Sequence, residues 1–168
     1  MRLAPRLAGV LAALTIPGLA ACGFTPLYAT PGVTPNLASV DVITPEGRTG
    51  HLLSEDLQDD LAITHDRAPQ YRLALALDET RFSRGQSTEQ LATWYELSLR
   101  VSYSLIEIST GRTLTAGVMP VSVSYDAADD PYAGIVAQQD GQKRAAAEAS
   151  QRIRLELAAF FAERAKTP

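Results

Sequence analysis

Strict alternation of apolar and polar side chains between residues 95 and 105 constrains the fold of this 168-residue chain more than any other feature. The apolar members are Tyr95, Leu97, Leu99, Val101, Tyr103 and Leu105, and the polar members between them are Glu96, Ser98, Arg100, Ser102 and Ser104. Successive side chains of a β-strand point to opposite faces of a sheet, so a period of two indicates a strand. We therefore predict a long strand here, with Leu99 and Val101 pointing into the core and Arg100 facing outward.

Two flanking segments alternate in the same way. The apolar positions are Tyr71, Leu73, Leu75 and Leu77 in residues 70–78, and Met119, Val121, Val123 and Tyr125 in residues 113–125. Residues 109–112 read Ser-Thr-Gly-Arg and predict a tight turn, so the strands on either side of it form an antiparallel hairpin. The polar stretch 81–89 contains Gly85 and predicts a loop. A further short strand is predicted at residues 40–43, before Thr44-Pro45.

Two segments have the spacing of amphipathic helices. Residues 50–64 carry Leu53, Leu57 and Leu61 at intervals of four, with an acidic outer face of Glu55, Asp56, Asp59 and Asp60. This face fits either a cation site or a solvated surface, and we favour the solvated surface because no loop geometry or histidine accompanies it. The second helix is predicted over residues 132–166, after Asp129-Asp130-Pro131, with a bent or frayed beginning at Gly134 and Gly141. Its apolar stripe comprises Ala146, Ala149, Ile153, Leu157, Phe160 and Phe161.

The order strand–helix–three strands–helix predicts an α+β fold. We expect a mostly antiparallel four-stranded sheet with two helices packed on one face. The length suits a single domain, which we place at residues 39–168. Residues 22–38 contain Pro26, Pro31, Gly32 and Pro35 and are expected to form an extended tether.

The first 22 residues have the pattern of a lipoprotein signal. Arg2 and Arg6 precede an uncharged apolar stretch, Leu7 to Leu19, which is shorter than the roughly 20 residues of a transmembrane helix. Leu19-Ala20-Ala21-Cys22 then offers an apolar residue, two small residues and the only cysteine of the chain. We therefore predict that residues 1–21 are removed and that Cys22 carries the lipid. An ordinary secretory signal with a cysteine nearby by chance is the less favoured interpretation.

Composition disfavours several classes of function. The formal net charge of −4 gives no support to nucleic-acid binding. His51 and His65 are too isolated in the sequence to build a metal site. The sequence has no nucleophile elbow and no phosphate-binding glycine loop. We expect no enzymatic activity, no metal and no cofactor apart from the covalent lipid on Cys22.

The segment from Cys22 to Tyr28, Cys-Gly-Phe-Thr-Pro-Leu-Tyr, resembles the start of the lipopolysaccharide-assembly lipoproteins of the LptE family, in their alphaproteobacterial form. Length, order of elements and the Ala- and Gln-rich last helix agree with this resemblance. It implies a lipid-anchored protein at the periplasmic face of the outer membrane. It further implies a plug inside an LptD-like β-barrel, where the protein binds lipopolysaccharide and assists its insertion into the outer leaflet.

Four arginines are candidates for contact with lipopolysaccharide, because a guanidinium matches phosphate oxygens. They are Arg81 and Arg84 in the predicted loop, Arg100 on the exposed strand face, and Arg112 at the hairpin turn. If the strand at residues 70–78 pairs beside the hairpin, Arg112 lies at the opposite end of the sheet from Arg81 and Arg84. We favour the Arg81–Arg84 end because it holds two guanidiniums. The simpler interpretation of each residue is a solubilising charge.

Two other functions stay open on the sequence alone. The chain fits a structural accessory lipoprotein of another envelope or export complex without glycolipid binding. A periplasmic hydrolase is the least favoured possibility, because no catalytic constellation is present.

Overall fold

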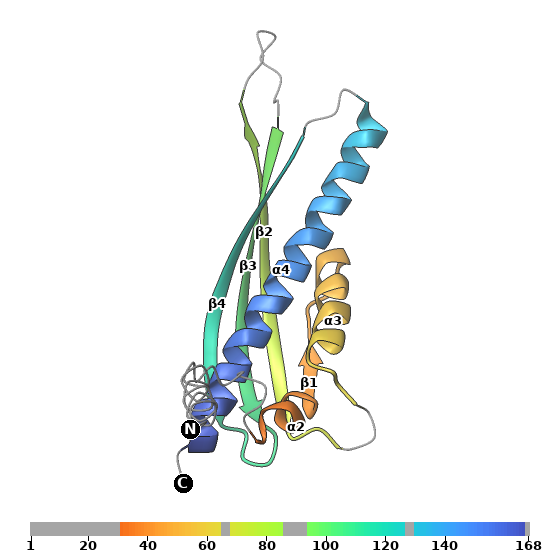
Figure 1. The fold of residues 1–168 in the computed structure, drawn as a ribbon. Helices are drawn as coiled ribbons and strands as arrows, with labels where there is room; N and C mark the ends of the chain where they lie inside the picture. Colours follow the sequence, from red (N-terminus) through yellow and green to blue (C-terminus); the bar gives the residue numbers. More distant parts are fainter. Residues whose placement is uncertain (1–30, 65–67, 86–93, 127–129, 167–168) are drawn as a thin grey trace, which may run out of the picture.

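The computed structural model describes residues 31–64, 68–85, 94–126 and 130–166 (Figure 1). Its elements in chain order are α2 (Val33–Leu37), β1 (Val40–Ile43), α3 (Arg48–Asp60), β2 (Tyr71–Arg84), β3 (Trp94–Glu107), β4 (Thr113–Asp126) and α4 (Pro131–Lys166). The predicted α+β fold is therefore confirmed, with the short helix α2 added in front of the first strand.

The sheet has the strand order β1-β2-β3-β4. β1 pairs with β2 in parallel, and the other two pairings are antiparallel, so the sheet is mostly antiparallel and contains the β3–β4 hairpin, both as predicted. The hairpin between β3 and β4 closes where the Glu107 N–H donates to the Arg112 carbonyl at 2.9 Å. Gly111 has a φ of +68° in this turn, a left-handed conformation that favours glycine.

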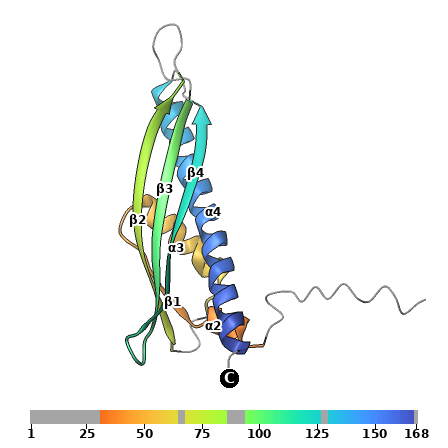
Figure 2. The same cartoon turned by 90° about the vertical axis from the view of Figure 1, so that its left-hand side faces the viewer.

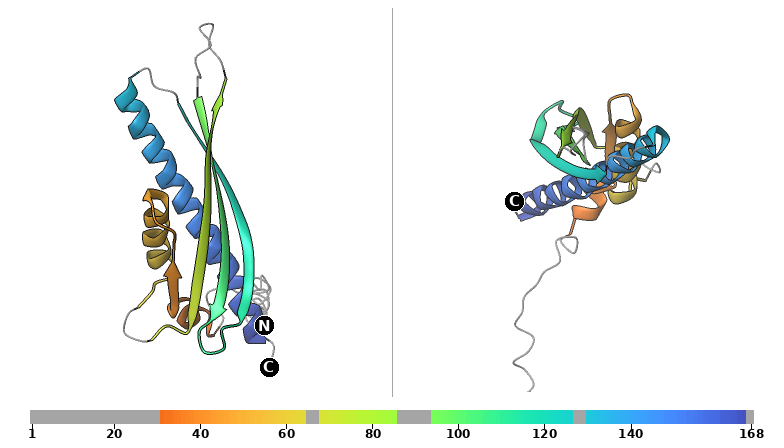
Figure 3. Two further views of the ribbon diagram at one scale, coloured as in Figure 1. Left: turned by 180° about the vertical axis from the view of Figure 1, so that it is seen from behind. Right: turned by 90° about the horizontal axis from the view of Figure 1, so that it is seen from above.

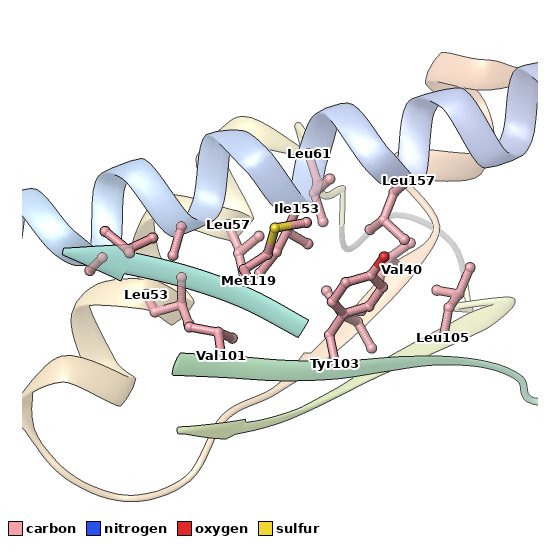
Figure 4. Packing of buried hydrophobic residues seen from close by; sticks show 14 of the residues in the cluster. Val40, Leu53, Leu57, Leu61, Val101, Tyr103, Leu105, Met119, Ile153 and Leu157 are labelled. Carbon is pink, nitrogen blue, oxygen red and sulfur yellow. The ribbon is translucent and has the colours of Figure 1, made fainter. Parts of the chain in front are cut away.

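Both long helices lie on one face of the sheet, as predicted (Figures 1 and 3). Viewed from the other side, β2, β3 and β4 lie in front of the helices, and none of the described helices covers this outer face (Figure 2). The core fills the space between the layers. Figure 4 shows Val101 of β3, Leu57 of α3 and Ile153 of α4 directed into this space. Leu99 and Val101 are both 0% exposed and Arg100 is exposed, which confirms the predicted orientation of the long strand.

The predicted loop at residues 81–89 is wrong for its first residues. β2 continues to Arg84, and each residue from Arg81 to Arg84 is in register with a residue of β3. Backbone hydrogen bonding to β3, which itself begins at Trp94, outweighs the polar composition of this stretch. Residues 86–89 lie outside the described residues.

The extended tether is also wrong at its C-terminal end. Val33 and Leu37 lie one helical turn apart in α2, and both are buried, at 0% and 3% exposure. Burial of this apolar pair stabilises the short helix α2, which the proline-rich composition did not predict. The remaining residues of the expected tether, 22–30, lie outside the described residues, as do the expected signal peptide and Cys22.

α4 runs without interruption through both glycines, so the predicted fraying is not found. The Asp130 carboxylate caps the helix by accepting the Tyr132 N–H at 2.7 Å, as the sequence predicted. Gly141 is buried, and a Cβ there would come within 3.1 Å of the Tyr125 ring, so glycine at this position permits the close packing of α4 on β4. Of the two phenylalanines in the stripe, Phe161 is buried, with its ring centroid 5.1 Å from that of Tyr71, whereas Phe160 is only partly buried.

The acidic face of α3 is only partly solvated. Glu55 and Asp59 are exposed, as expected, whereas Asp60 faces α4. The Ser150 hydroxyl donates to Asp60 at 2.6 Å, and Arg154 lies 3.4 Å from the same carboxylate. The four acidic residues spread too far around the helix to lie together on its exposed side. Asp60, at one end of this spread, therefore lies at the interface with α4.

Candidate functional site

The candidate site lies at the end of the sheet where β2 ends and β3 begins, which we call the distal end. It holds Arg81 and Arg84 of β2, Trp94 and Tyr95 of β3, and the first turns of α4 (Figure 1). The opposite end of the sheet carries α2 and the β3–β4 turn with Arg112. The predicted separation of the two groups of arginines along the sheet is therefore confirmed.

Arg84 lies among aromatic side chains on the outer face of the sheet. Its guanidinium carbon is 5.5 Å from the centroid of the Phe82 ring, and its Nε donates to Glu96 at 2.9 Å. Trp94 is the residue of β3 in register with Arg84. Phe82 and Trp94 are exposed to 45% and 37%, which is high for large apolar side chains. A half-exposed cation thus lies beside an exposed apolar surface.

Arg81 lies on the other face. It is an odd number of residues from Arg84 along one strand, so the two side chains point to opposite faces of the sheet. The Arg81 guanidinium stacks on the Tyr95 ring at 4.9 Å and donates to the Gln138 side chain of α4 at 2.9 Å. The expected pair of guanidiniums at one site is therefore not formed, and each arginine has separate surroundings.

Arg100 and Arg112 lie apart from the distal end. Arg100 is exposed in the middle of the outer face, between Asp78 of β2 and Pro120 of β4 in the register. Arg112 is exposed in the turn at the other end, where its N–H contacts the Thr110 hydroxyl at 3.3 Å. The structure thus divides the four candidate arginines among three regions.

An apolar ridge on α4 was missed by the sequence analysis. Tyr132, Ile135 and Val136 are exposed to 75%, 55% and 51%. They precede the buried residues Ala146, Ala149 and Ser150 by fourteen positions, which is close to four helical turns, so they continue the buried side of α4. Their own segment of α4 lies beyond the N-terminal end of α3, which covers the later residues (Figure 1). The sequence shows these apolar residues at helical spacing. It does not show where the covering helix α3 begins relative to them.

A groove adjoins these residues between the end of β4 and the first half of α4. Its volume is about 580 Å³, and Trp94, Tyr125 and Ala137 form its apolar part. Asp140 and Arg144, which form an ion pair at 2.8 Å, lie on its polar side. The distal end thus combines arginines, exposed aromatic rings, an apolar ridge and a groove.

Other polar groups stabilise the packing of the helices on the sheet. Glu79 accepts hydrogen bonds from Thr49 of α3 at 2.5 Å and from Gln142 of α4 at 2.8 Å. Burial and the neighbouring Glu156 raise the pKa of the Tyr103 hydroxyl. Within the described ranges, no cluster of three or more His, Cys, Asp or Glu side chains has the arrangement of a metal site. Over the same ranges, no helix has the length and apolar character needed to cross a membrane.

No family model matches the sequence, and no curated protein matches it either. The fold, however, is that of small bacterial lipoproteins. The crystal structure of a minor lipoprotein from Acinetobacter baumannii superposes with a TM-score of 0.58 at 16% identity, covering 71% of this chain and 90% of that one. An uncharacterized lipoprotein B from Nitrosomonas europaea gives 0.55 at 16% identity, with 72% and 82% coverage.

A nearer relative is a candidate lipoprotein from Caulobacter crescentus CB15. Its crystal structure superposes with a TM-score of 0.69 at 44% identity, covering 79% of this chain and 97% of that one. The chain described here belongs to the same lipoprotein family as the Caulobacter protein.

Proposed function

We propose that this chain is an outer-membrane lipoprotein that binds lipopolysaccharide and assists its insertion into the outer leaflet as the plug of an LptD-like β-barrel. Membership of a lipoprotein family supports lipid anchoring, for which Cys22 is the candidate residue. The likeness of the segment from Cys22 to Tyr28 to the LptE family supports the specific role. The proposal assigns the chain no catalytic step.

The observation that carries the glycolipid part is the close placement of Arg84 and exposed apolar side chains at the distal end. Lipopolysaccharide presents phosphate groups next to acyl chains. A guanidinium pairs with phosphate oxygens through two parallel N–H donors. Phe82 and Trp94 beside Arg84 offer apolar surface to acyl chains on the outer face. The ridge of Tyr132, Ile135 and Val136 offers a second apolar surface on the helix side of the sheet. A phosphate would compete with Glu96 for Arg84.

The length of the segment after Cys22 bears on how far the distal end can lie from the anchor. Cys22 precedes Pro31, the first described residue, by nine residues, a reach of at most about 30 Å. The described chain begins at the α2 end, and β2 alone spans about 46 Å at about 3.3 Å per residue. The distal end therefore lies a full strand length from the point where the anchored segment joins the domain.

Binding of purified lipopolysaccharide to the full chain in detergent tests the glycolipid assignment. Arg84→Glu should weaken affinity about fivefold, which corresponds to about 1 kcal/mol for a partly exposed charge-assisted contact. Binding to the parent chain should weaken with added salt. Arg112→Glu makes the same charge change at the opposite end and should leave affinity unchanged. Equal losses in the two variants, or none in either, would contradict the distal site.

A second candidate is a structural accessory lipoprotein that docks another envelope protein. The middle of the outer face of the sheet favours it, because many of the residues there are small and no described helix covers them. These small residues are Ala74, Ala76, Ser98, Ser102, Ser104, Ala116 and Ser122. Such a surface allows close approach by a flat partner without requiring a glycolipid.

A further inference from the structure

β4 is an outer strand of the sheet, and most of its length carries no charge. It is the last strand in the order β1-β2-β3-β4, so one side of its backbone faces away from β3. Residues 113–125 contain no Asp, Glu, Lys or Arg. An uncharged outer strand of this length presents backbone donors and acceptors to any other strand, and proteins protect such edges with charged residues, proline or a covering element. Within residues 113–125 Pro120 protects only its own position, so the rest of the protection has to come from another element.

Two arginines of α4 bond to this edge. Arg144 Nη2 donates to the Ser124 carbonyl oxygen at 3.2 Å, and Arg152 Nη1 donates to the Pro120 carbonyl oxygen at 2.9 Å. Backbone groups four residues apart on a strand point to the same side, so both carbonyls belong to the free edge. Pro120 has no N–H and offers the edge no donor, which is the position in a sheet where proline is tolerated.

The spacing of the helix matches that of the strand. Eight residues separate the arginines on α4, a rise of about 12 Å. Four residues separate the two carbonyls on β4, a distance of about 13 Å. Each arginine is also held by the carboxylate four residues earlier: Asp140 lies 2.8 Å from Arg144, and Glu148 pairs with Arg152. The repeated acid–arginine pair therefore places both guanidiniums along β4.

We propose that Arg144 and Arg152 close the free edge of β4 against strand addition, and that the strand they exclude is β4 of a second copy of this chain. Two β4 strands paired antiparallel about Ser122 would place Pro120 of one copy opposite Ser124 of the other. The Ser124 N–H of each copy would then donate to the Pro120 carbonyl of the other, which Arg152 occupies, and the Arg144 guanidinium bound at Ser124 would stand in the path of the incoming strand. Since residues 113–125 carry no charge, no like-charge repulsion would oppose it.

Crosslinking of the full chain in detergent tests this proposal. Ser122→Cys places a thiol on an exposed position of β4, and a short bis-maleimide then joins two copies that pair there. Adding Arg144→Gln and Arg152→Gln should raise the crosslinked dimer at least fivefold over the Ser122→Cys chain. The matched control, Arg164→Gln with Lys166→Gln, removes the same charge from α4, where these residues pair with Glu107 of β3 and Glu163 instead of with Ser124 or Pro120, and it should give no increase. Equal dimer formation in the two double variants, or no increase in either of them over the Ser122→Cys chain, would overturn the proposal.

Sedimentation of chains without the introduced cysteine supplies the second measurement. The Arg144→Gln, Arg152→Gln chain should sediment as a dimer, and adding Ser122→Pro should return it to a monomer. Ser122 has the same orientation in β4 as Pro120, so proline there removes an edge donor and leaves the pairing with β3 intact. A dimer that persists with Ser122→Pro would show that the copies associate elsewhere. Circular dichroism checks the fold, and Arg152→Gln alone carries the comparison if the double variant unfolds.

Discussion

Gly117 of β4 lies directly opposite Tyr103 of β3, and the tyrosine ring occupies the space that a side chain at position 117 would need. The hydroxyl of Tyr103 continues past the glycine and donates to the Glu156 carboxylate of α4. Figure 4 shows this ring between the sheet and the helix. The absence of a side chain at Gly117 therefore allows Tyr103 of β3 to reach across β4 and bond to α4.

The first prediction follows from this contact. In Gly117→Ala, the new Cβ would lie 2.7 Å from Tyr103 Cε1, so the ring must move and its hydrogen bond to Glu156 is lost. We expect a loss of about 1–3 kcal/mol in the free energy of unfolding, measured by chemical denaturation. Gly134→Ala is the control: nothing lies within 4 Å of its Cβ, and alanine in a helix should stabilise by up to about 1 kcal/mol. An unchanged stability of Gly117→Ala would contradict the packing described.

The second prediction compares neighbours on β3. Leu99 is fully buried, so Leu99→Ala should reduce the free energy of unfolding by about 2–5 kcal/mol. Arg100→Ala, one residue along on the outer face, should change it by no more than about 0.5 kcal/mol. Chemical denaturation of the two variants checks the difference. Similar losses at both positions would mean that the two faces of the sheet are not distinguished as described.

The third prediction concerns pH. Burial, with added repulsion from Asp60 and Glu55, raises the pKa of Asp56, although Lys143 opposes the shift. A carboxyl whose pKa is raised in the folded state destabilises the fold when ionised, and this cost disappears as pH falls through the raised pKa. Asp56→Asn should therefore be more stable than the parent at pH 7, and the gain should vanish below about pH 4, the ordinary value for aspartate.

Thermal unfolding at both pH values measures this difference. Asp59→Asn, on the exposed side of the same helix, is the matched control and should show no comparable gain. A gain for Asp56→Asn that is the same at pH 7 and below pH 4 would rule out the buried charge as its cause.

The fourth prediction concerns the anchor. Cys22→Ala should block processing and leave an unacylated precursor, because the thiol is the acceptor of the lipid. Labelling with a radioactive fatty acid measures the acylation. Label on the Cys22→Ala chain would show that the anchor lies elsewhere.

Local periodicity was sufficient to predict the sheet, both long helices and the side of the sheet that is buried. It did not predict that β2 extends to Arg84, since that extension depends on backbone pairing with a strand distant in sequence. The same error left the separation of Arg81 and Arg84 onto opposite faces unpredicted, because side chains do not alternate between two faces in a loop. The exposed ridge from Tyr132 to Val136 depends on where α3 begins relative to α4, and no residue of the ridge itself encodes that.

The central claim is that this lipoprotein works with a β-barrel and lipopolysaccharide at the outer membrane. Affinity purification of the tagged full chain from detergent-solubilised membranes of its own host tests it most directly. The account predicts that an outer-membrane β-barrel protein co-purifies in near-equal amount, together with lipopolysaccharide that Arg84→Glu reduces. Recovery of inner-membrane transporter subunits instead, with neither a β-barrel protein nor lipopolysaccharide, would contradict it and favour the accessory role.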